Sequence, residues 1–215
     1  WTLGDVVVAG RTDSGAKIYD VPERVFGDLG AAEEEFAPWA VRERVHAAGL
    51  LSRAGGAMWS MLGKVRTSPL IDAMLEAGEL IDVAIEGTPR RYLASPAFLA
   101  PKPVRYDNRV RILGPLDPLL WDRNLVRHVF DFEYVWEVYK PAHQRKWGWY
   151  VCPLLYRDQL IGRIDARVDG DVLIVKKLWL EGDGEHDDKR DAIRAALERH
   201  AELCGAKKVK MPRRS

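Results

Sequence analysis

The stretch WYVCPLLYRDQLIGRIDARVDGDVLIVKKLWL, residues 149–180, decides the fold of the C-terminal half of the chain. It holds three runs rich in aromatic and β-branched residues, separated by turn-forming pairs at Arg157-Asp158 and Asp169-Gly170. A similar run comes shortly before it. We therefore predict a four-stranded antiparallel meander, with strands at Tyr134–Tyr139 and at residues 149–156, 159–168 and 172–180. Because Val151 to Leu155 shows little alternation of apolar and polar residues, both faces of that strand should be buried, which favours a small barrel or a strongly curled sheet.

Helices are predicted before and after these strands. An acidic loop, Glu181 to Asp188, leads into an amphipathic helix that runs to about Cys204, and Lys207 to Met211 is a candidate edge strand. The inner side of that helix should carry Ile193, Ala196, Leu197 and Ala201. Ahead of the strands, Leu116 to Phe132 contains a Pro-bounded turn and a short helix that Asp122 can cap. The apolar side of the short helix should consist of Leu125, Val126 and Val129.

In the N-terminal half, the sequence predicts three short helices followed by a β-hairpin. The first covers Glu34 to Ala48, with its regular part starting near Pro38. The second runs from a Ser52 cap to Met61 and stops at Gly63, and the dipeptide Ser68-Pro69 opens the third. Three helices and a hairpin in this order are typical of a winged helix, in which the hairpin is the wing.

An internal repeat links the start of the chain to this wing. LGDVVVAGRTDSGAKIYDVPERVF at residues 3–26 and AGELIDVAIEGTPRRYLASPAFL at residues 77–99 share a glycine and an acid, two strands around a turn, a Tyr, and then Pro and an aromatic residue. We interpret the opening hairpin as the wing of a preceding winged helix, and the chain as the C-terminal part of a longer protein. The alternative is an independent N-terminal hairpin.

The predicted fold class is α+β, in three parts. Residues 1–28 are the wing and tail of the preceding unit, residues 29–100 a winged-helix domain, and residues 101–215 a β-rich domain with a terminal helix, entered through a Pro-rich connector at Ala100 to Val104. The chain of 215 residues has a net charge of +1, but the charge is uneven: residues 1–100 hold 10 Lys or Arg against 14 Asp or Glu, and residues 101–215 hold 23 against 18. A polyanionic partner should therefore bind the second part.

Several classes of protein are disfavoured. The apolar runs are too short to span a membrane and no secretory signal is visible, so we expect a soluble, cytoplasmic protein. Cys152 and Cys204 form neither a disulfide framework nor a metal-binding spacing, and the five histidines have no ligand spacing. The sequence contains no Gly-rich phosphate loop, no Gly-x-Ser-x-Gly and no Cys-x-x-Cys. We expect neither a metal ion nor another cofactor.

The strongest candidate for nucleic-acid binding is KPAHQRKWGWY, residues 140–150. This stretch has no acidic residue, so a loop between two strands here can contact phosphates and offer an aromatic face to a base or sugar. The candidate contact residues are Lys140, His143, Arg145, Lys146 and Trp147. The alternative is a solvated hairpin tip whose Trp147 and Trp149 belong to the core.

The wings carry a second set of candidate contacts. Arg11 and Lys17 flank the first turn, and Arg90 and Arg91 flank the second, as backbone contacts would. Such cations also discourage edge pairing of surface hairpins, which is the alternative reading. The outer side of the third helix offers Asp72, Ala73, Glu76 and Ala77, with no cation. That helix is therefore expected to act as scaffold rather than as a base reader.

The β-rich part contains carboxylates that a paired acid and base would need. They are Asp117, Asp122, Glu133, Glu137 and Asp165. Structural roles are favoured over catalysis: Asp122 as a helix cap, and Asp165 or Glu137 as ion-pair partners of Arg163 or Arg123.

Two segments carry a family resemblance. GPLDPLLWDR at residues 114–123 and FDFEYVWEVYKPAHQRKWGWYVCPLLYRDQLIGRIDAR at residues 130–167 resemble the C-terminal signature of winged-helix DNA glycosylases of the AlkZ/YcaQ type. The matching motif residues, for which structural roles are expected, are Asp117, Trp121, Asp122, Arg123, Glu137, Arg163 and Asp165. The resemblance implies repair of alkylated DNA, including unhooking of interstrand crosslinks, by cleavage of an N-glycosidic bond. It also implies double-stranded DNA, damaged or crosslinked, as the partner, with a nucleoid location when bound and no obligate protein partner.

The chain departs from the family at the catalytic motif. In this family that role is assigned to a Gln-apolar-Asp or Gln-apolar-Gln motif near the N-terminus, whereas the two glutamines here, Gln144 and Gln159, stand in QRK and QLI. We therefore expect no catalytic residue of this kind among the 215 residues and no glycosylase activity from them alone. A winged-helix regulator or adaptor that binds DNA without chemistry is the alternative function, and a purely structural domain is a third.

Overall fold

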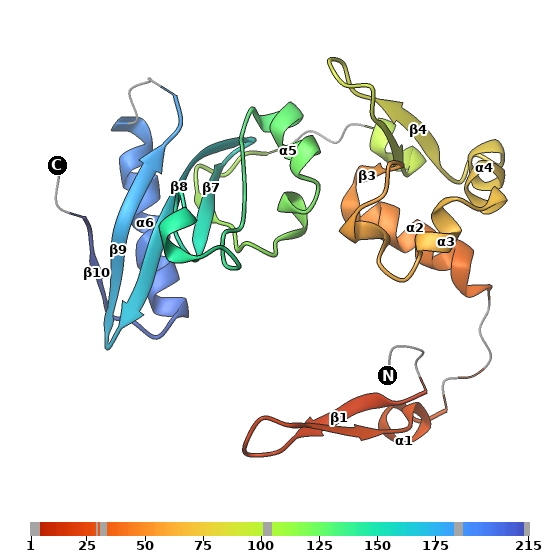
Figure 1. Cartoon of the computed structure of the whole chain (residues 1–215), viewed down its shortest axis with the longest axis horizontal. Coiled ribbons are helices and arrows are strands. Elements are labelled where there is room, and N and C mark those ends of the chain that lie inside the picture. Colours follow the sequence, from red (N-terminus) through yellow and green to blue (C-terminus); the bar gives the residue numbers. More distant parts are fainter. Residues whose placement is uncertain (1–4, 29, 31–33, 101–104, 183–186, 213–215) are drawn as a thin grey trace. The chain divides into compact units, whose positions relative to one another are not determined.

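The computed structural model describes residues 5–28, 30, 34–100, 105–182 and 187–212 (Figure 1). The predicted connector at residues 101–104 and much of the predicted acidic loop lie outside these ranges. The chain divides into two compact units, Trp1–Trp39 and Ala40–Ser215. The domain boundaries predicted from the sequence stay predictions.

The first unit is a β-hairpin with a short helix. β1 (Val7–Arg11) pairs antiparallel with β2 (Lys17–Asp20), and α1 (Pro22–Phe26) follows. The turn closes through a 2.8 Å hydrogen bond from the Gly15 amide to the Thr12 carbonyl. A further hydrogen bond runs from the Ala16 amide to the Thr12 hydroxyl. The predicted hairpin and its turn are thus confirmed.

The second unit begins with helices that pack on a small sheet. The elements in this part are α2 (Phe36–Ala48), which starts in the first unit, β3 (Leu51–Ser52), a 3-10 helix (Ala57–Trp59), α3 (Gly63–Arg66), α4 (Pro69–Glu76), β4 (Ile81–Ala84) and β5 (Arg91–Ala94). The strands form a three-stranded antiparallel sheet in the order β3-β5-β4. The core between helices and sheet includes Val41, Val45, Leu51, Ile71, Met74 and Leu93. The first and third predicted helices and the β4-β5 hairpin are confirmed.

The second predicted helix is wrong. Ser52 does not cap a helix: it belongs to β3, opposite Tyr92. Gly55 and Gly56 both adopt positive φ, which ends any helix at that point, and only one turn of 3-10 helix follows. Gly63, expected to stop the helix, is the first residue of α3.

A five-stranded sheet and a long helix form the C-terminal part. The sheet order is β10 (Lys208–Lys210), β9 (Val172–Leu180), β8 (Gln159–Asp169), β7 (Val151–Tyr156) and β6 (Val110–Ile112). All pairs are antiparallel except β10 with β9, and register shifts occur within the β7-β8 and β8-β9 pairs. Such irregularities bend strands, and the sheet curls into a half-barrel. The predicted strands at residues 149–156, 159–168 and 172–180 and the edge strand near residue 208 are confirmed.

The helix α6 (Asp187–Leu203) covers the curled sheet (Figure 1). Its predicted inner residues are all buried and join side chains of β7, β8 and β9 in one core: Ile193, Ala196, Leu197 and Ala201 with Cys152, Leu154, Ile164, Leu173 and Val175. After α6 the chain returns to the sheet edge as β10, held by a hydrogen bond from the Lys207 amide to the Asp171 carbonyl.

The fourth predicted strand, Tyr134–Tyr139, is wrong. This segment has no regular secondary structure, and the edge position beside β7 is taken by β6, which was not predicted. Tyr134 and Glu137 are buried, and the Tyr134 hydroxyl donates to the Val151 carbonyl at 3.0 Å. Side chains rather than backbone ladders therefore attach this segment to the sheet.

A small second core lies beneath the segment that precedes the strands. The segment contains a 3-10 helix (Pro118–Leu120) and α5 (Arg123–Phe130). The core beneath it includes Leu120, Val126, Phe132 and Tyr134. The predicted α5 is confirmed, but Val129, expected on its apolar side, is exposed. Across the residues that the structure describes, no helix is long and apolar enough to cross a membrane, and no cluster of His, Cys, Asp and Glu could hold a metal ion.

Candidate nucleic-acid interface

A buried carboxylate holds both ends of the loop at residues 140–150. Glu137 is 2% exposed and accepts a 2.8 Å hydrogen bond from Lys140 Nζ. Its two oxygens also accept from three successive backbone amides on the far side of the loop, those of Lys146, Trp147 and Gly148, at 3.1, 2.8 and 3.3 Å. Glu137 therefore ties the start of the loop to its end.

The same contacts decide the protonation of Glu137. Burial alone would raise its pKa, but the hydrogen bonds from Lys140 and from the backbone amides of Trp147, Lys146 and Gly148 favour the charged form and lower the pKa to about 2. The carboxylate is thus ionised at neutral pH. It neutralises the charge of Lys140, whereas Lys146 is exposed and Arg145 half-buried.

Trp147 is fixed between charged and aromatic neighbours. The guanidinium carbon of Arg163 lies 4.1 Å from the centroid of the Trp147 ring and 4.1 Å from that of Phe132. Trp179 meets Trp147 edge to face at 5.3 Å between centroids. Each such contact contributes up to about 1 to 2 kcal/mol. Trp147 is half-buried, so it is neither a freely exposed side chain nor a residue of the core.

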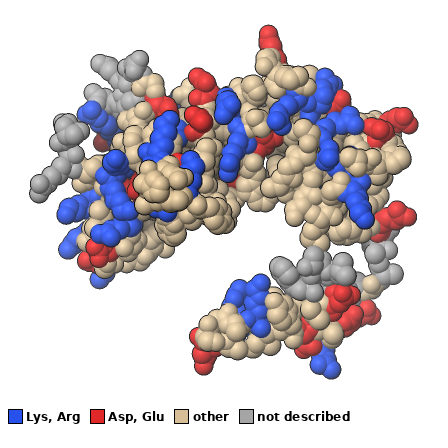
Figure 2. All heavy atoms as spheres, viewed as in Figure 1, with Lys and Arg blue, Asp and Glu red and all other residues tan. Residues whose placement is uncertain are grey.

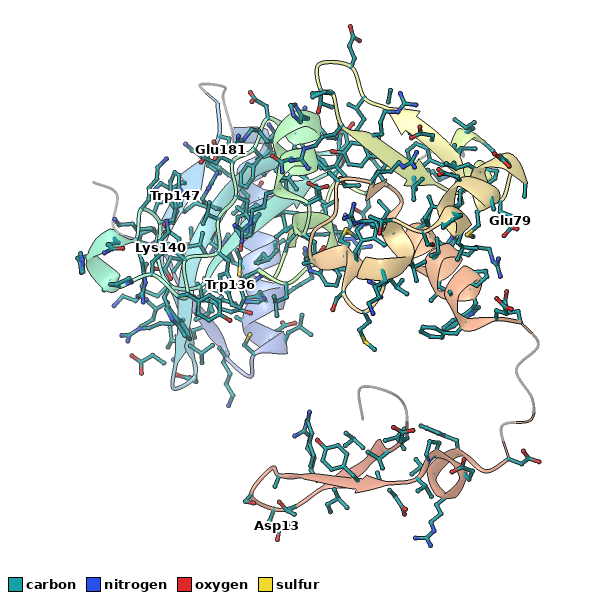
Figure 3. All side chains as sticks on the ribbon, turned by 45° about the vertical axis from the view of Figure 1, so that its right-hand side comes forward. Asp13, Glu79, Trp136, Lys140, Trp147 and Glu181 are labelled. Atoms are coloured by element: carbon teal, nitrogen blue, oxygen red, sulfur yellow. The ribbon has the colours of Figure 1, made fainter. Side chains whose placement is uncertain are left out.

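Arg163 is itself held by polar partners. It donates to Glu181 Oε1 through Nη2 at 2.6 Å and to the Glu133 carbonyl through Nη1 at 2.9 Å. In Figure 3, Glu181 and Trp147 lie above Lys140, and Trp136 lies below it. The loop is thus attached to the sheet on one side by the Arg163 stack and at its base by Glu137.

The remaining basic residues of the loop differ in exposure. His143 and Lys146 are exposed, and Lys146 Nζ lies 4.7 Å from the Trp147 ring centroid. Arg145 is half-buried because its Nε donates to the Lys140 carbonyl at 2.8 Å. A 3-10 turn at Ala142–Gln144 forms the tip of the loop. Figure 2 shows Lys and Arg side chains distributed over the visible face of the part that holds the sheet.

Comparison with known proteins gives the family. The family model described as "DNA glycosylase AlkZ-like" matches residues 1–203. The chain belongs to the AlkZ-like family. The solved structure of the Streptomyces sahachiroi DNA glycosylase AlkZ is similar to this chain, with a TM-score of 0.58 at 16% sequence identity, over 97% of this chain and 54% of that one. The chain thus spans about half the length of that solved relative, and the likeness between the two structures is one of fold.

The AlkZ-like chain uses two of its motif carboxylates as caps. Asp117 accepts from the Leu119 amide at 3.0 Å, and Asp122 accepts from the Asn124 and Leu125 amides at 3.1 Å each. Between them, the Trp121 indole donates to the Leu116 carbonyl at 2.8 Å. Arg123 is the first residue of α5. The predicted capping role of Asp122 is confirmed.

The predicted ion pairs of the motif are wrong. Arg163 pairs with Glu181, and Glu137 pairs with Lys140. Asp165 has Lys176 as its partner at 3.7 Å. Asp165 also crowds the loop, because a Cβ placed on Gly148 would lie 2.8 Å from its Oδ2. Lys176 lies on β9 and Glu181 directly follows it, so both pairs depend on the β8-β9 register, which a single sequence does not give.

At the predicted wings, Arg11 and Arg91 have partners of their own. Arg11 Nη1 donates to the Gly15 carbonyl within its own turn. Arg91 pairs with Asp82 across β4 and β5 at 3.0 Å. Arg90 is half-buried, and Lys17 is exposed at the first residue of β2. Arg91 therefore presents a partly neutralised charge.

Sequence reasoning missed several residues that shape the site. Phe132 and Glu181 contact Arg163, Trp179 contacts Trp147, and Lys176 pairs with Asp165. The rings of Trp136, Tyr139 and Tyr150 form a connected row. A sequence signal for these rings was present: Trp136 and Tyr139 precede the basic loop, and Trp149 and Tyr150 are its last two residues.

Proposed function

We propose that this chain provides the DNA-binding surface of a DNA glycosylase that removes alkylated bases or unhooks interstrand crosslinks. The observation that carries this proposal is the loop at residues 140–150, acid-free and fixed by Glu137, in a chain of the AlkZ-like family. A fixed loop binds phosphates with less loss of conformational freedom than a mobile one. Its exposed cations, Lys146 among them, supply the charge that phosphate contacts need.

The proposal includes the interpretation of residues 29–100 as a winged-helix domain. The order α2, β3, α3, α4, β4, β5 supports it, with β4 and β5 as the wing. Asp72 on α4 is 69% exposed and pairs with Arg53 at 3.1 Å. An acidic outer face would repel phosphates, so α4 acts as scaffold and DNA lies elsewhere on the domain.

Catalysis is proposed to lie outside these residues. The family's Gln-apolar-Asp or Gln-apolar-Gln motif does not occur in the sequence, and Gln144 and Gln159 stand in unrelated contexts. The chain alone should therefore bind alkylated duplex DNA without releasing bases from it. Release of free base from methylated DNA by the purified 215-residue chain would contradict this part of the proposal.

A salt titration tests the DNA contact. The double variant Arg145→Gln Lys146→Gln should flatten the slope of log affinity against log salt by about 0.9 for each phosphate that the loop no longer neutralises. Arg194→Gln is the matched control, since Arg194 is 79% exposed on α6 and pairs with Glu198. Its slope should equal that of the wild type. Equal slopes for all three proteins would show that the loop does not contact DNA phosphates.

A further inference from the structure

Four aromatic side chains form a continuous row at the base of the loop, here called the aromatic row: Tyr139, Trp136, Tyr150 and Trp149. The Trp136 ring meets Tyr139 at 5.8 Å and Tyr150 at 6.4 Å between centroids, both edge to face. Tyr150 in turn lies 6.0 Å from Trp149. Trp136 is thus the centre that orients its neighbours, since edge-to-face contacts fix the angle between rings.

The aromatic row faces solvent over much of its surface. Tyr139 is 89% exposed, Trp149 54% and Tyr150 43%. Single exposed apolar residues are common, but several large rings in mutual contact form the kind of apolar patch that marks a binding surface. Trp136 is half-buried and anchors the row to the domain.

The charges beside the aromatic row select the class of ligand. Lys140 directly follows Tyr139, and the acid-free loop joins Tyr139 to Trp149. Glu137, the nearest acid in sequence, is buried and engaged by Lys140 and three amides. Exposed rings beside an acid-free, basic stretch of sequence complement a ligand that has flat apolar faces and a negative backbone. A nucleic-acid strand has both.

The exposed rings further select an unpaired strand. In a duplex the base faces are covered by neighbouring bases, so only nucleotides outside the stack can place a face on an aromatic side chain. Alternating aromatic and basic groups are how proteins bind single-stranded segments without reading sequence. Rings exposed on the surface, rather than enclosed in a deep pocket, fit this mode.

We infer that the aromatic row binds unpaired nucleotides by stacking, with Tyr139 and Trp149 as the contact rings and the loop cations on the adjoining phosphates. This inference rests on the proposed DNA-binding function and adds to it the form of DNA that is bound. It assigns the two sides of the loop different tasks: Trp147 is held inward by Arg163, and Tyr139 and Trp149 face outward.

The test compares two DNAs that differ only in pairing. Fluorescence anisotropy would measure the affinity of the full chain for a fully paired duplex and for the same duplex with a short single-stranded gap. The wild type should prefer the gapped DNA. Tyr139→Ala and Trp149→Ala should each reduce affinity for gapped DNA about 5-fold or more, with a smaller effect on the paired duplex. Tyr139→Phe and Trp149→Phe should retain the preference, because the stacking ring remains.

A matched control and distinct outcomes separate the two proposals. Tyr106→Ala removes a ring that is 50% exposed and lies outside the aromatic row, so it should leave the preference unchanged. Failure of the wild type to bind either DNA would overturn the proposed function and this inference together. Equal binding of both DNAs, or an unchanged preference in the Ala variants, would overturn the inference alone. If the wild type self-associates and the Ala variants lose self-association but keep the DNA preference, the aromatic row binds a second copy of the chain. That result would also overturn the inference.

Discussion

The Glu137 carboxylate and the Trp147 backbone amide form a 2.8 Å hydrogen bond that closes the basic loop across ten residues of sequence. Glu137, three residues before the loop, thereby fixes the backbone in the second half of the loop. Trp147 lies there, and its ring centroid is 4.1 Å from the Arg163 guanidinium carbon. The loop's geometry therefore depends on one buried anion more than on its own residues.

Removing that anion should destabilise the protein. Glu137→Ala leaves three amides and the Lys140 ammonium without their acceptor, which should lower the free energy of unfolding by about 3 kcal/mol. Urea unfolding followed by Trp fluorescence measures it. Glu133→Ala is the control, because the exposed Glu133 engages Arg163 only through its backbone carbonyl. A decrease in the control as large as in Glu137→Ala would contradict the assignment.

The pH dependence of stability should reveal the ionisation of Glu137. Its pKa falls from an ordinary value of 4.5 to about 2 in the folded chain, so its contribution is complete above pH 4.5 and is lost as the pH falls toward 2. Stability of the wild type should therefore decrease across this interval. The stability difference between wild type and Glu137→Gln should shrink across the same interval. Urea midpoints at several pH values would measure it, and a difference that does not vary with pH would refute the role.

Gly162 should resist substitution because of the approach of β9. A Cβ on this residue would overlap the Trp179 carbonyl oxygen and come within 3.1 Å of Leu180 Cα. Backbone atoms cannot move aside as a flexible side chain can, so Gly162→Ala should lower the free energy of unfolding by about 2 kcal/mol or more. Gly114→Ala is the matched control, since a Cβ there meets no described atom within 4 Å. Equal stability of the two variants would show that β9 yields.

Local patterns in the sequence predicted the elements whose stability is local. β7, β8 and β9 are separated by turn residues and rich in β-branched and aromatic side chains, and α6 has a clear apolar side. The strand predicted at Tyr134–Tyr139 is wrong because the structure of that segment is not local. That run has strand composition, but its buried Tyr134 and Glu137 bind backbone groups of other segments, and no single-sequence pattern reveals those partners.

The sequence predicted which residues make up the candidate site but not which of them contact each other. The basic loop is visible as an acid-free run, whereas the pairing of Arg163 with Glu181 depends on the β8-β9 register, in which Arg163 lies opposite Trp179. Glu181 follows Trp179 by two residues and so lies on the same side. The register shift between Asp165 and Ala166 also sets which lysine reaches Asp165, and it is set by packing rather than by propensity.

The two cysteines should differ sharply in reactivity. Burial raises the pKa of Cys152 to about 11, with smaller contributions from Asp165 and Cys204, so its reactive thiolate is scarce at neutral pH. Cys204 is exposed just beyond α6. A maleimide should therefore add once to the native chain, as read by intact mass. Cys204→Ser should abolish the adduct and Cys152→Ser should retain it. Two adducts on the native chain would show that β7 opens.

The cap at α5 should account for a measurable share of stability. Asp122 Oδ1 accepts from the amides of Asn124 and Leu125, the free donors of the first turn. Asp122→Ala should lower the free energy of unfolding by about 1 kcal/mol, and Asp122→Asn should cost far less because its side-chain oxygen can accept the same bonds. Urea unfolding compares the two variants with the wild type. If Asn and Ala cost the same, the negative charge of Asp122, and not its capping geometry, stabilises this helix.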